Sequence, residues 1–495
     1  MLIATPGVYL RRFQTSRPIR DPSSAPLAHQ RLFAHGIAYV VDFWKRALLL
    51  GAIGVAATSV VAATSLVGMN LWIEYKELAP ETDEECKKWE WDFDMERWTG
   101  GAKGGTDSGL GWRGCGSLRA AWIALNWGVG VPNDPATSLS SSSRFGHIER
   151  RLQAAHEFLA VSYTVALQKD VEGRLRQETP MEILVRLADV LERMGTKDAL
   201  YEARSELEEV WAHITGDAQG ASRLALKLGD INQRMGLTVD ALEWWARSLD
   251  IACGRPGAQP PTPTIPKTAP PSPSAQRTLA QVFVSLSAFY AMTGKLRQAQ
   301  QVEVAALELL RTIPSPASFA SATPPQALHS LYLLHRSALL SVHLAEVSHG
   351  LRSPTGASIE WLIRAAESSE RVARVLTGVQ RSAGAKGAPA PSADKPLLSV
   401  FESSPSMKRP ARGLLRDARR TATESWHLIG LLHEQNRAAD AQETALACYE
   451  RALGWAGVTP EKEAGEGGGL EAEWKALWGN YTRVREAIKA KAGKA

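Results

Sequence analysis

Two patterns of apolar residues divide this chain of 495 residues. Residues 47–73 carry no charged side chain, whereas Lys45 and Arg46 precede this run and Glu74 and Lys76 follow it. A helix of that length extends roughly 40 Å, and the hydrocarbon core of a bilayer is about 30 Å thick. The run therefore predicts a single transmembrane helix. The alternative is a buried helix in a soluble core.

After the predicted span, apolar residues recur with the spacing of helices. From residue 145 onward, Ile148, Leu152, Ala155 and Leu159 fall on one helical face, and no comparable run alternates with a period of two. Glycines separate these helices into pairs, which indicates internal repetition. The sequence therefore predicts an all-α fold in which a helical-repeat solenoid spans residues 144–455.

Small and large residues recur at fixed offsets within these pairs. Gly236, Ala241 and Trp245 follow Leu228-Gly229, and Gly294 and Ala299 stand at the same offsets after Leu286-Ser287. The residues expected to pack between paired helices are Leu228, Gly229, Gly236, Ala241, Trp245, Gly294, Ala299, Trp426, Gly430, Tyr449 and Ala452. This pattern resembles the tetratricopeptide repeat (TPR), in which Trp-x2-Leu-Gly-x2-Tyr precedes Ala-x3-Phe with a period of about 34 residues.

The resemblance implies a stack of helix pairs whose concave surface holds a peptide or a protein. By register, polar positions of the first helix in each pair face this surface. The candidate protein-binding residues are Arg223, Asp230, Gln233, Gln281, His427 and Glu434. The alternative is that these side chains are simply solvated.

Segments unsuited to helices interrupt the repeats. Residues 254–274 and 377–396 are rich in proline, glycine and serine, and residues 465–469 are rich in glycine. We expect disordered loops there, between or after the repeats. A last helix at 470–490, which contains Trp474, Leu477 and Trp478, is expected to cap the open end of the stack.

The juxtamembrane region, residues 74–143, has an unusual composition. The stretch ECKKWEWDFDMERW alternates aromatic and acidic residues, and a glycine-rich stretch follows it. Two interpretations remain open: a packed subdomain that docks on the repeats, or a patch that binds a partner or a lipid surface. Residues 120–131 are uncharged but too short to span a membrane, and they predict an interfacial segment or a core helix. A serine-rich linker at 135–143 ends the region.

The positive charge of the chain lies at its start. The net charge is +5, and residues 1–73 hold seven basic and two acidic residues, so the rest of the chain is neutral and gives no indication of nucleic-acid binding. The leader, residues 1–46, begins with four arginines and no acid within its first twenty residues, which is typical of a mitochondrial presequence. The alternative is the cytosolic tail of a type II protein in another membrane. The flanking charges place the body across the membrane from the leader, which is the intermembrane space for the mitochondrial inner membrane.

The sequence contains no recognisable catalytic motif. His156-Glu157 and His433-Glu434 each lack the second histidine of a zinc-protease motif, and no complete phosphate-binding loop is found. The four cysteines form no CxxC pair, so a Cys86–Cys115 disulfide and two unrelated thiols both remain possible. We expect no enzyme, no cofactor, no metal site and no small-molecule substrate.

The layout as a whole resembles one group of proteins. A basic presequence, one transmembrane helix and a TPR body are similar to the fungal adaptor subunit of the mitochondrial inner-membrane i-AAA protease complex. This resemblance implies a non-enzymatic adaptor in protein quality control, whose partners are AAA protease subunits and unfolded or misfolded proteins. Alternatives are a TPR assembly factor for a respiratory complex, an outer-membrane import receptor with a cytosolic body, and an anchored enzyme that uses the juxtamembrane module.

Overall fold

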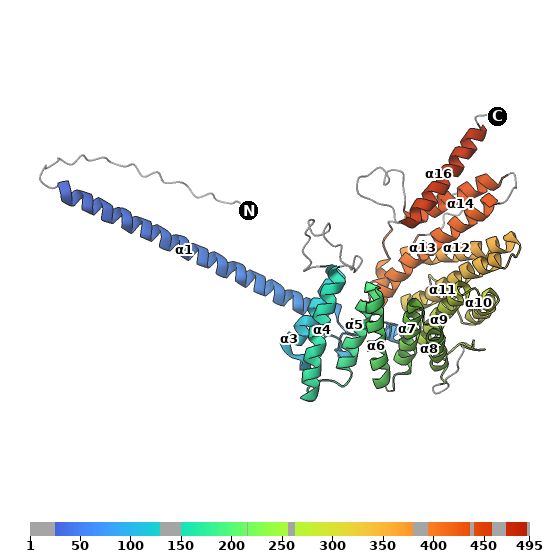
Figure 1. Ribbon diagram of the computed structural model, residues 1–495, viewed down its shortest axis with the longest axis horizontal. Helices are drawn as coiled ribbons and strands as arrows, with labels where there is room; N and C mark the ends of the chain where they lie inside the picture. The colour runs from blue at the N-terminus through green and yellow to red at the C-terminus, as the bar shows by residue number, and fades with distance from the viewer. Residues whose placement is uncertain are drawn as a thin grey trace. The chain divides into compact units, whose positions relative to one another are not determined.

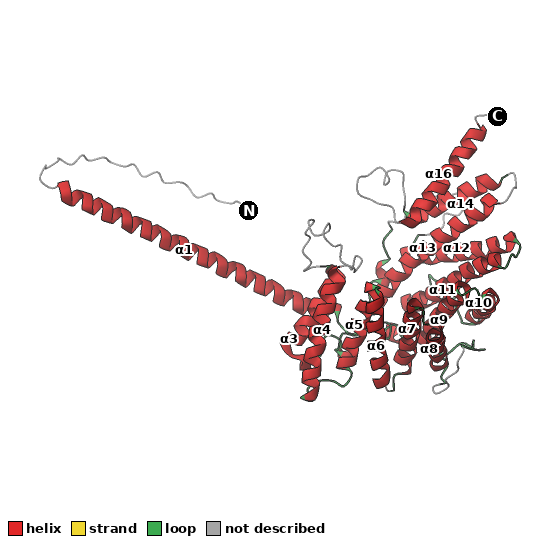
Figure 2. Ribbon diagram, viewed as in Figure 1, coloured by secondary structure: helices red, strands yellow, loops and turns green. Residues whose placement is uncertain are grey.

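The computed structural model describes residues 25–128, 150–214, 216–255, 263–379, 395–435, 440–457 and 472–492. Within these ranges every regular element is a helix (Figure 2). The chain divides into two compact units, Met1–Leu71 and Trp72–Ala495. The all-α prediction is therefore confirmed for the residues that the structure describes.

The first unit consists largely of helix α1 (Ala25–Trp72), drawn in blue in Figure 1. This helix begins within the predicted leader, well before the predicted start of the span at residue 47. Phe43–Glu77 is long and apolar enough to cross a membrane. Leu48, Ile53 and Val60 are exposed, and Thr58 Oγ1 donates to the Gly54 carbonyl over 3.0 Å. An apolar surface exposed on all sides is suited to contact with lipid.

The second unit begins with short helices and continues as paired ones. The short elements are η1 (Ile73–Glu77), α2 (Glu84–Lys88), η2 (Gly101–Lys103), η3 (Ser108–Leu110) and, further on, η5 (Ser399–Phe401). The long helices are α3 (Gly111–Trp127), α4 (Arg150–Val171), α5 (Thr179–Met194), α6 (Lys197–His213), α7 (Ala218–Met235), α8 (Thr238–Ala252), α9 (Pro273–Met292), α10 (Leu296–Arg311), α11 (Pro324–Gly350), α12 (Thr355–Thr377), α13 (Pro405–Gln435), α14 (Ala441–Ala456) and α16 (Ala472–Ala492).

These long helices pack in successive pairs. The pairs are α3–α4, α5–α6, α7–α8, α9–α10, α11–α12 and α13–α14, and α16 packs on α14 at the end of the chain (Figure 1). The first helices of neighbouring pairs also contact one another, since α7 packs on α9, α9 on α11 and α11 on α13. This arrangement is a TPR-like α-solenoid, in which the first helices share one face.

Small residues allow the paired helices to approach closely. A side chain on Gly229 of α7 would overlap the ring of Trp245 on α8, and one on Gly430 of α13 would overlap the ring of Tyr449 on α14. Trp245 and Tyr449 are fully buried. Gly236 ends α7 with a φ of 81°, a conformation that glycine adopts at no steric cost.

Two boundaries in the structure differ from those predicted from the sequence: the start of the helix pairs and the extent of the first insertion. Helix α3, inside the predicted juxtamembrane region, is the first member of the pair α3–α4, so the helix pairs begin before residue 144. Trp122 and its neighbours up to Ala124 are buried, which makes this part of the uncharged stretch a core helix, whereas Trp127 at the end of α3 is exposed. Within the predicted insertion at 254–274, Ile265 and Ala269 pack against the repeat core, and α9 begins at Pro273. The prediction of a disordered loop failed for this part, because the apolar side chains of Ile265 and Ala269 bury against the repeats although prolines surround them.

Other predictions fall wholly or partly outside the described residues. They concern the leader before residue 25, the linker at 135–143, residues 380–394 of the second insertion and the glycine-rich stretch at 465–469. The four cysteines are described and are free thiols. Burial raises the pKa of Cys86 to about 12, which makes its thiol unreactive at neutral pH.

Candidate protein-binding groove

The juxtamembrane segment, defined here as residues 81–97, lies across the first helices of the solenoid. It contains the single-turn helix α2 and then consecutive turns, in which the Asp94 amide donates to the Trp91 carbonyl over 3.0 Å. Its side chains and carbonyls contact residues of α5, α7, α9, α11 and α13 or of the turns that precede these helices. These are the first helices of consecutive pairs, so the segment occupies the face that the TPR resemblance assigns to ligands.

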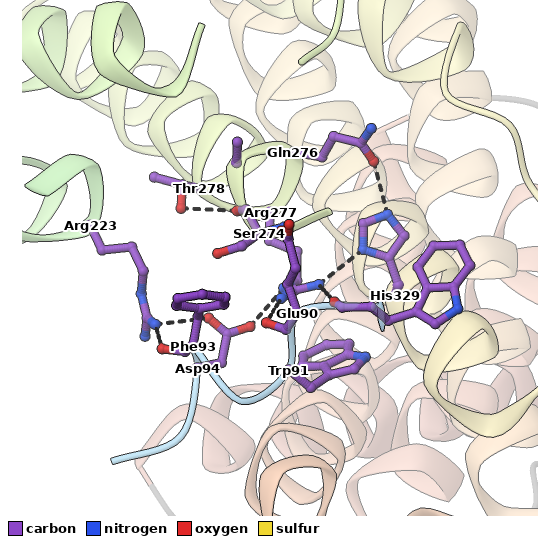
Figure 3. Close-up of polar contacts among 12 residues, drawn as sticks. Glu90, Trp91, Phe93, Asp94, Arg223, Ser274, Gln276, Arg277, Thr278 and His329 are labelled. Carbon is purple, nitrogen blue, oxygen red and sulfur yellow. Dashed lines mark hydrogen bonds and ion pairs between the residues drawn. The ribbon is translucent and has the colours of Figure 1, made fainter. Parts of the chain in front are cut away.

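Trp91 is the apolar anchor of the segment. Its side chain is 1% exposed, and its indole Nε1 donates to the carbonyl of Pro325 in the first turn of α11 over 3.0 Å. The guanidinium of Arg277, on α9, lies 4.0 Å from the centre of the Trp91 ring (Figure 3). This cation–π contact is strong because both groups are desolvated.

Arg277 is a buried cation whose ligands come mainly from the segment. It is 3% exposed, and its Nε donates to Asp94 Oδ2 over 2.7 Å. Its Nη2 donates to the Glu90 carbonyl over 2.7 Å, and its Nη1 donates to the Trp89 carbonyl over 3.1 Å. A buried guanidinium requires such partners, because an uncompensated charge in the interior is strongly destabilising.

His329, on α11, completes the shell of Arg277. Its Nδ1 lies 3.2 Å from Arg277 Nη1, and its Nε2 lies 3.0 Å from Gln276 Oε1 (Figure 3). Burial and, to a smaller extent, the charge of Arg277 lower the pKa of His329 to about 3. A neutral imidazole that donates through Nε2 accepts from Arg277 through Nδ1, so both contacts are satisfied.

Carboxylates of this region lie at the amino ends of first helices. Glu90 Oε2 accepts hydrogen bonds from the Ser272 hydroxyl and from the Ser274 amide (2.8 Å) at the start of α9. Glu81 Oε2 accepts from the Ser404 hydroxyl and the Ser406 amide (3.2 Å) at the start of α13. The amino end of a helix presents free N–H groups and a positive dipole, which favour a carboxylate.

Just after the segment, a third carboxylate, that of Asp107, also lies at the amino end of a first helix. Asp107 Oδ2 accepts from the Thr179 hydroxyl over 2.6 Å and from the Arg176 amide over 3.1 Å, at the start of α5. Burial acts to raise the pKa of Asp107, but the hydrogen bonds from Thr179, Gly109 and Arg176 outweigh it, so the pKa is lowered. Asp107 is therefore ionised in the folded chain at neutral pH.

Glu96 connects two helices that are distant in sequence. It lies 3.2 Å from Arg186 Nη1 and 3.6 Å from Arg193 Nη2, both on α5, and it also pairs with Arg409 on α13. Burial acts to raise the pKa of Glu96, but the charges of Arg186, Arg409 and Arg193 outweigh it, so the pKa is lowered. Glu96 thus joins the two ends of the face that the segment covers.

A cavity of about 1040 Å³ remains beside residues 93–97. Residues of α5, α7 and α13 line it, among them Met181, Val185, Leu224 and Pro410. Glu182 Oε2 and Arg186 Nε, on two further lining residues, are buried and make no hydrogen bond within the described parts of the chain. The segment therefore fills the face incompletely, and the open part is lined by both apolar and polar groups.

The six candidate protein-binding residues predicted from the sequence do not form one open surface. Arg223 donates to the Phe93 carbonyl and pairs with Asp94 Oδ1 at 3.2 Å, so the segment already occupies it (Figure 3). Asp230 accepts from Trp245 Nε1 over 3.0 Å, within its own helix pair. Gln233 Nε2 lies 3.9 Å from the Met292 sulfur, and Gln281 is half-buried on α9.

The other two candidates are covered by the last helix. His427 Nε2 lies 3.0 Å from Asn480 Nδ2, and Glu434 Oε2 lies 2.7 Å from Arg483 Nη1, with both partners on α16. Helix α16 packs on α14, and its Asn480 and Arg483 side chains reach these two residues of α13, so the polar groups of both candidates already have partners within the chain. The last helix was expected to cap the open end of the stack, and it packs on α14, the last of the paired helices.

Of the residues that hold the segment, Arg223 was recognised from the sequence, whereas Arg277 and His329 were not. Arg277 and His329 lie on first helices, but nothing in their local pattern marks them as buried partners of a distant segment. The signal that was present is the acidic and aromatic composition of residues 84–98. Of its two interpretations, docking on the repeats is the one that the structure shows for residues 81–97.

No metal-binding group of three His, Cys, Asp or Glu side chains is found within the described ranges. Of the histidines of α11, His329 and His335 are buried, and burial lowers the pKa of His335 to about 3, the Arg336 charge adding to the effect. No protein-family model and no curated protein matches this chain.

Proposed function

We propose that this chain is a membrane-anchored, non-enzymatic adaptor that binds polypeptide on the face shared by its first helices. The observation that supports the proposal most is the binding of the juxtamembrane segment. Arg277 and Arg223 hold it through the main-chain carbonyls of Trp89, Glu90 and Phe93, which any polypeptide offers. Helical solenoids bind extended or irregular peptides in this way.

The proposal includes a cellular setting. The adaptor resides in the mitochondrial inner membrane with its body in the intermembrane space, and it presents unfolded or misfolded proteins to an AAA protease. The arginine-rich leader, the charges flanking the candidate span and the TPR-like solenoid support this setting.

The partners are tested by purification from the native membrane. The full chain, extracted in mild detergent, is expected to retain a denatured, fluorescently labelled protein and to co-purify with a membrane AAA protease. The folded form of the same labelled protein serves as the control. A quantitative pulldown that contains no such protease contradicts the protease assignment, and equal retention of the folded and denatured forms contradicts client binding.

The location is tested by protease protection in mitochondria. The body is expected to resist added protease in intact mitochondria and to be cleaved after rupture of the outer membrane. Cleavage in intact mitochondria would instead indicate a cytosolic body, as in an import receptor.

A further inference from the structure

We propose that segment 81–97 is an exchangeable internal ligand, and that the external ligand of the same face is a peptide of the same chemistry. Such a peptide has a carboxylate directly before an aromatic residue and another carboxylate three positions after it, as Glu90, Trp91 and Asp94 are placed here. This inference rests on the proposed function and names the class of polypeptide that the adaptor binds.

The contacts combine general and selective recognition. Three main-chain carbonyls of the segment accept hydrogen bonds from Arg277 and Arg223. Side chains supply the selectivity, since Trp91 fills an enclosed site, and the Glu90 carboxylate lies at the amino end of α9. A ligand that repeats these groups in the same order reproduces every contact.

Cys86 and Trp91 of the segment pack into the core of the later repeats, but the helices of the solenoid also pack directly on one another. Helix α7 packs directly on α9, α9 on α11 and α11 on α13, and each first helix packs on its pair partner. Gly229 and Trp245 illustrate such a contact, with no residue of the segment between them. The helices therefore keep their mutual contacts when one ligand replaces another.

The buried groups restrict what can replace the segment. Arg277 is 3% exposed, so a ligand without a carboxylate near the Asp94 position leaves an unpaired charge in the interior. A ligand without an aromatic residue leaves the Trp91 site empty, which is equally unfavourable. Within an unfolded chain, these two requirements select the segments that are both acidic and aromatic.

The open cavity provides an entry point. It adjoins residues 93–97, where Arg223, Arg186 and Arg409 contact the segment. An incoming carboxylate can pair with these arginines before Trp91 leaves its site, because the cavity is open beside them. Exchange then proceeds from the carboxyl end of the segment toward Trp91, one contact at a time.

Covalent attachment makes the segment a strong competitor. A tethered ligand acts at an effective concentration on the order of millimolar, so an external peptide binds weakly until the internal one is weakened. Weakening the segment in the chain is therefore expected to increase peptide binding, whereas removing Arg277 abolishes it.

The experiment uses the full chain in nanodiscs and a fluorescent synthetic peptide with the sequence of residues 84–97. The Trp91→Ala/Asp94→Asn chain is expected to bind this peptide about tenfold or more tightly than the unchanged chain. Adding Arg277→Gln to that chain is expected to return binding to the background. A peptide with the same two substitutions is the matched control, and it is expected not to bind.

The outcomes separate this inference from the proposed function. If the Trp91→Ala/Asp94→Asn chain is folded and binds the peptide no better than the unchanged chain, the segment is a fixed structural element and the inference fails. Retention of the denatured protein by the unchanged chain is measured in parallel, and its absence contradicts the proposed function instead.

A second measurement applies if the substituted chain does not fold. The unchanged chain is mixed with excess isotope-labelled peptide, so that fragments of the peptide and of the chain differ in mass. Hydrogen exchange in residues 86–94 is expected to increase severalfold, whereas unchanged exchange at saturating peptide overturns the inference.

Discussion

Arg277 and Glu370 are both buried charges, but their partners come from different parts of the chain. Glu370 on α12 is 2% exposed and accepts hydrogen bonds from the indoles of Trp426 (2.8 Å) and Trp455 (3.0 Å) on the next helix pair. It also pairs with Arg374 and with Arg451. Arg277 instead takes its carboxylate partner from Asp94, outside the repeats.

This difference separates a structural charge from a charge that recognises a ligand. The partners of Glu370 belong to neighbouring helices of the same stack, so that network forms whenever the repeats fold. The carboxylate partner of Arg277 arrives from a segment 183 positions away in sequence. A buried charge that the repeats cannot satisfy by themselves marks the place where the solenoid holds another polypeptide.

The largest expected effect tests the structural charge. Glu370→Ala removes the carboxylate that accepts hydrogen bonds from both Trp426 and Trp455 and that pairs with Arg451 and Arg374. We expect the free energy of unfolding of the repeat unit to fall by about 3–5 kcal/mol. Denaturant unfolding of the full chain in detergent measures it, with exposed Glu367→Ala as control. A loss equal to that of the control would contradict the assignment.

Removal of Arg277 tests the recognition charge. Arg277→Met is expected to lower stability by about 2–3 kcal/mol, because the segment loses one ion pair and several hydrogen bonds. Unlike Glu370→Ala, it is expected to make Lys87 and Lys88 readily cleavable by trypsin. Exposed Arg297→Met is the control. If trypsin cleaves Arg277→Met as slowly as Glu370→Ala and Arg297→Met, Arg277 does not hold the segment.

Glu303 extends the comparison to a buried acid that makes no ion pair with the described residues. Glu303 and Ser287 occupy the positions that Trp245 and Gly229 hold in the preceding pair, and Ser287 Oγ donates to the carboxyl over 2.7 Å. The pKa of Glu303 is raised to about 7, because burial and, to a smaller extent, the Glu346 charge raise it by more than the Ser287 hydrogen bond lowers it. His343 Nδ1 lies 2.9 Å from the same hydroxyl.

The raised pKa gives a prediction with a definite sign. Below the unfolded-state value of 4.5, both states are protonated and burial costs nothing. As the pH rises from there to about 7, the unfolded state loses its proton first, so folding becomes less favourable. Glu303→Gln is therefore expected to stabilise the chain by about 1–3 kcal/mol at pH 8 and to have little effect at pH 4.

The measurement for Glu303 is a series of unfolding curves between pH 4 and pH 8. Glu308→Gln, on the exposed side of the same helix, is the control and is expected to change nothing. A Glu303→Gln variant that is less stable than the unchanged chain at pH 8 would show that the buried carboxylate is stabilising after all.

The smallest expected effect concerns the helix-terminal carboxylates. Glu90→Gln keeps an acceptor for Ser274 but removes the charge at the amino end of α9, so stability is expected to fall by about 0.5–1 kcal/mol. Glu84→Gln, on the exposed side of α2, is the control. Thermal unfolding at low and high salt measures the difference. If the effect of Glu90→Gln equals that of Glu84→Gln, the helix end contributes nothing.

The sequence predicted what depends on local periodicity. The helix pairs, the contact of Gly229 with Trp245 and the last capping helix follow from residues close together in the chain. The position of segment 81–97 does not, because its contacts join Trp91 to Pro325 and Glu81 to Ser404, across 234 and 323 positions. Such contacts arise only once the solenoid has curved and brought α5 near α13.

For the candidate residues too, the sequence predicted local properties but not contacts with distant parts of the chain. Arg223 was identified by its register on α7, and the structure places it against the segment. His427 was also chosen as a polar position on a first helix, α13, but its Nε2 contacts Asn480 of α16. Register within a pair is a local property, whereas exposure depends on what the rest of the chain covers.

The central claim is that polypeptide binds the face shared by the first helices, and one crosslinking measurement tests it most directly. A photo-crosslinking amino acid replaces Val185, which lines the cavity on α5, or Tyr201, which is exposed on the second helix α6. After illumination of native membranes, we predict adducts with other proteins from position 185 and few from position 201. Equal adducts from both positions, or none from position 185, would contradict the account.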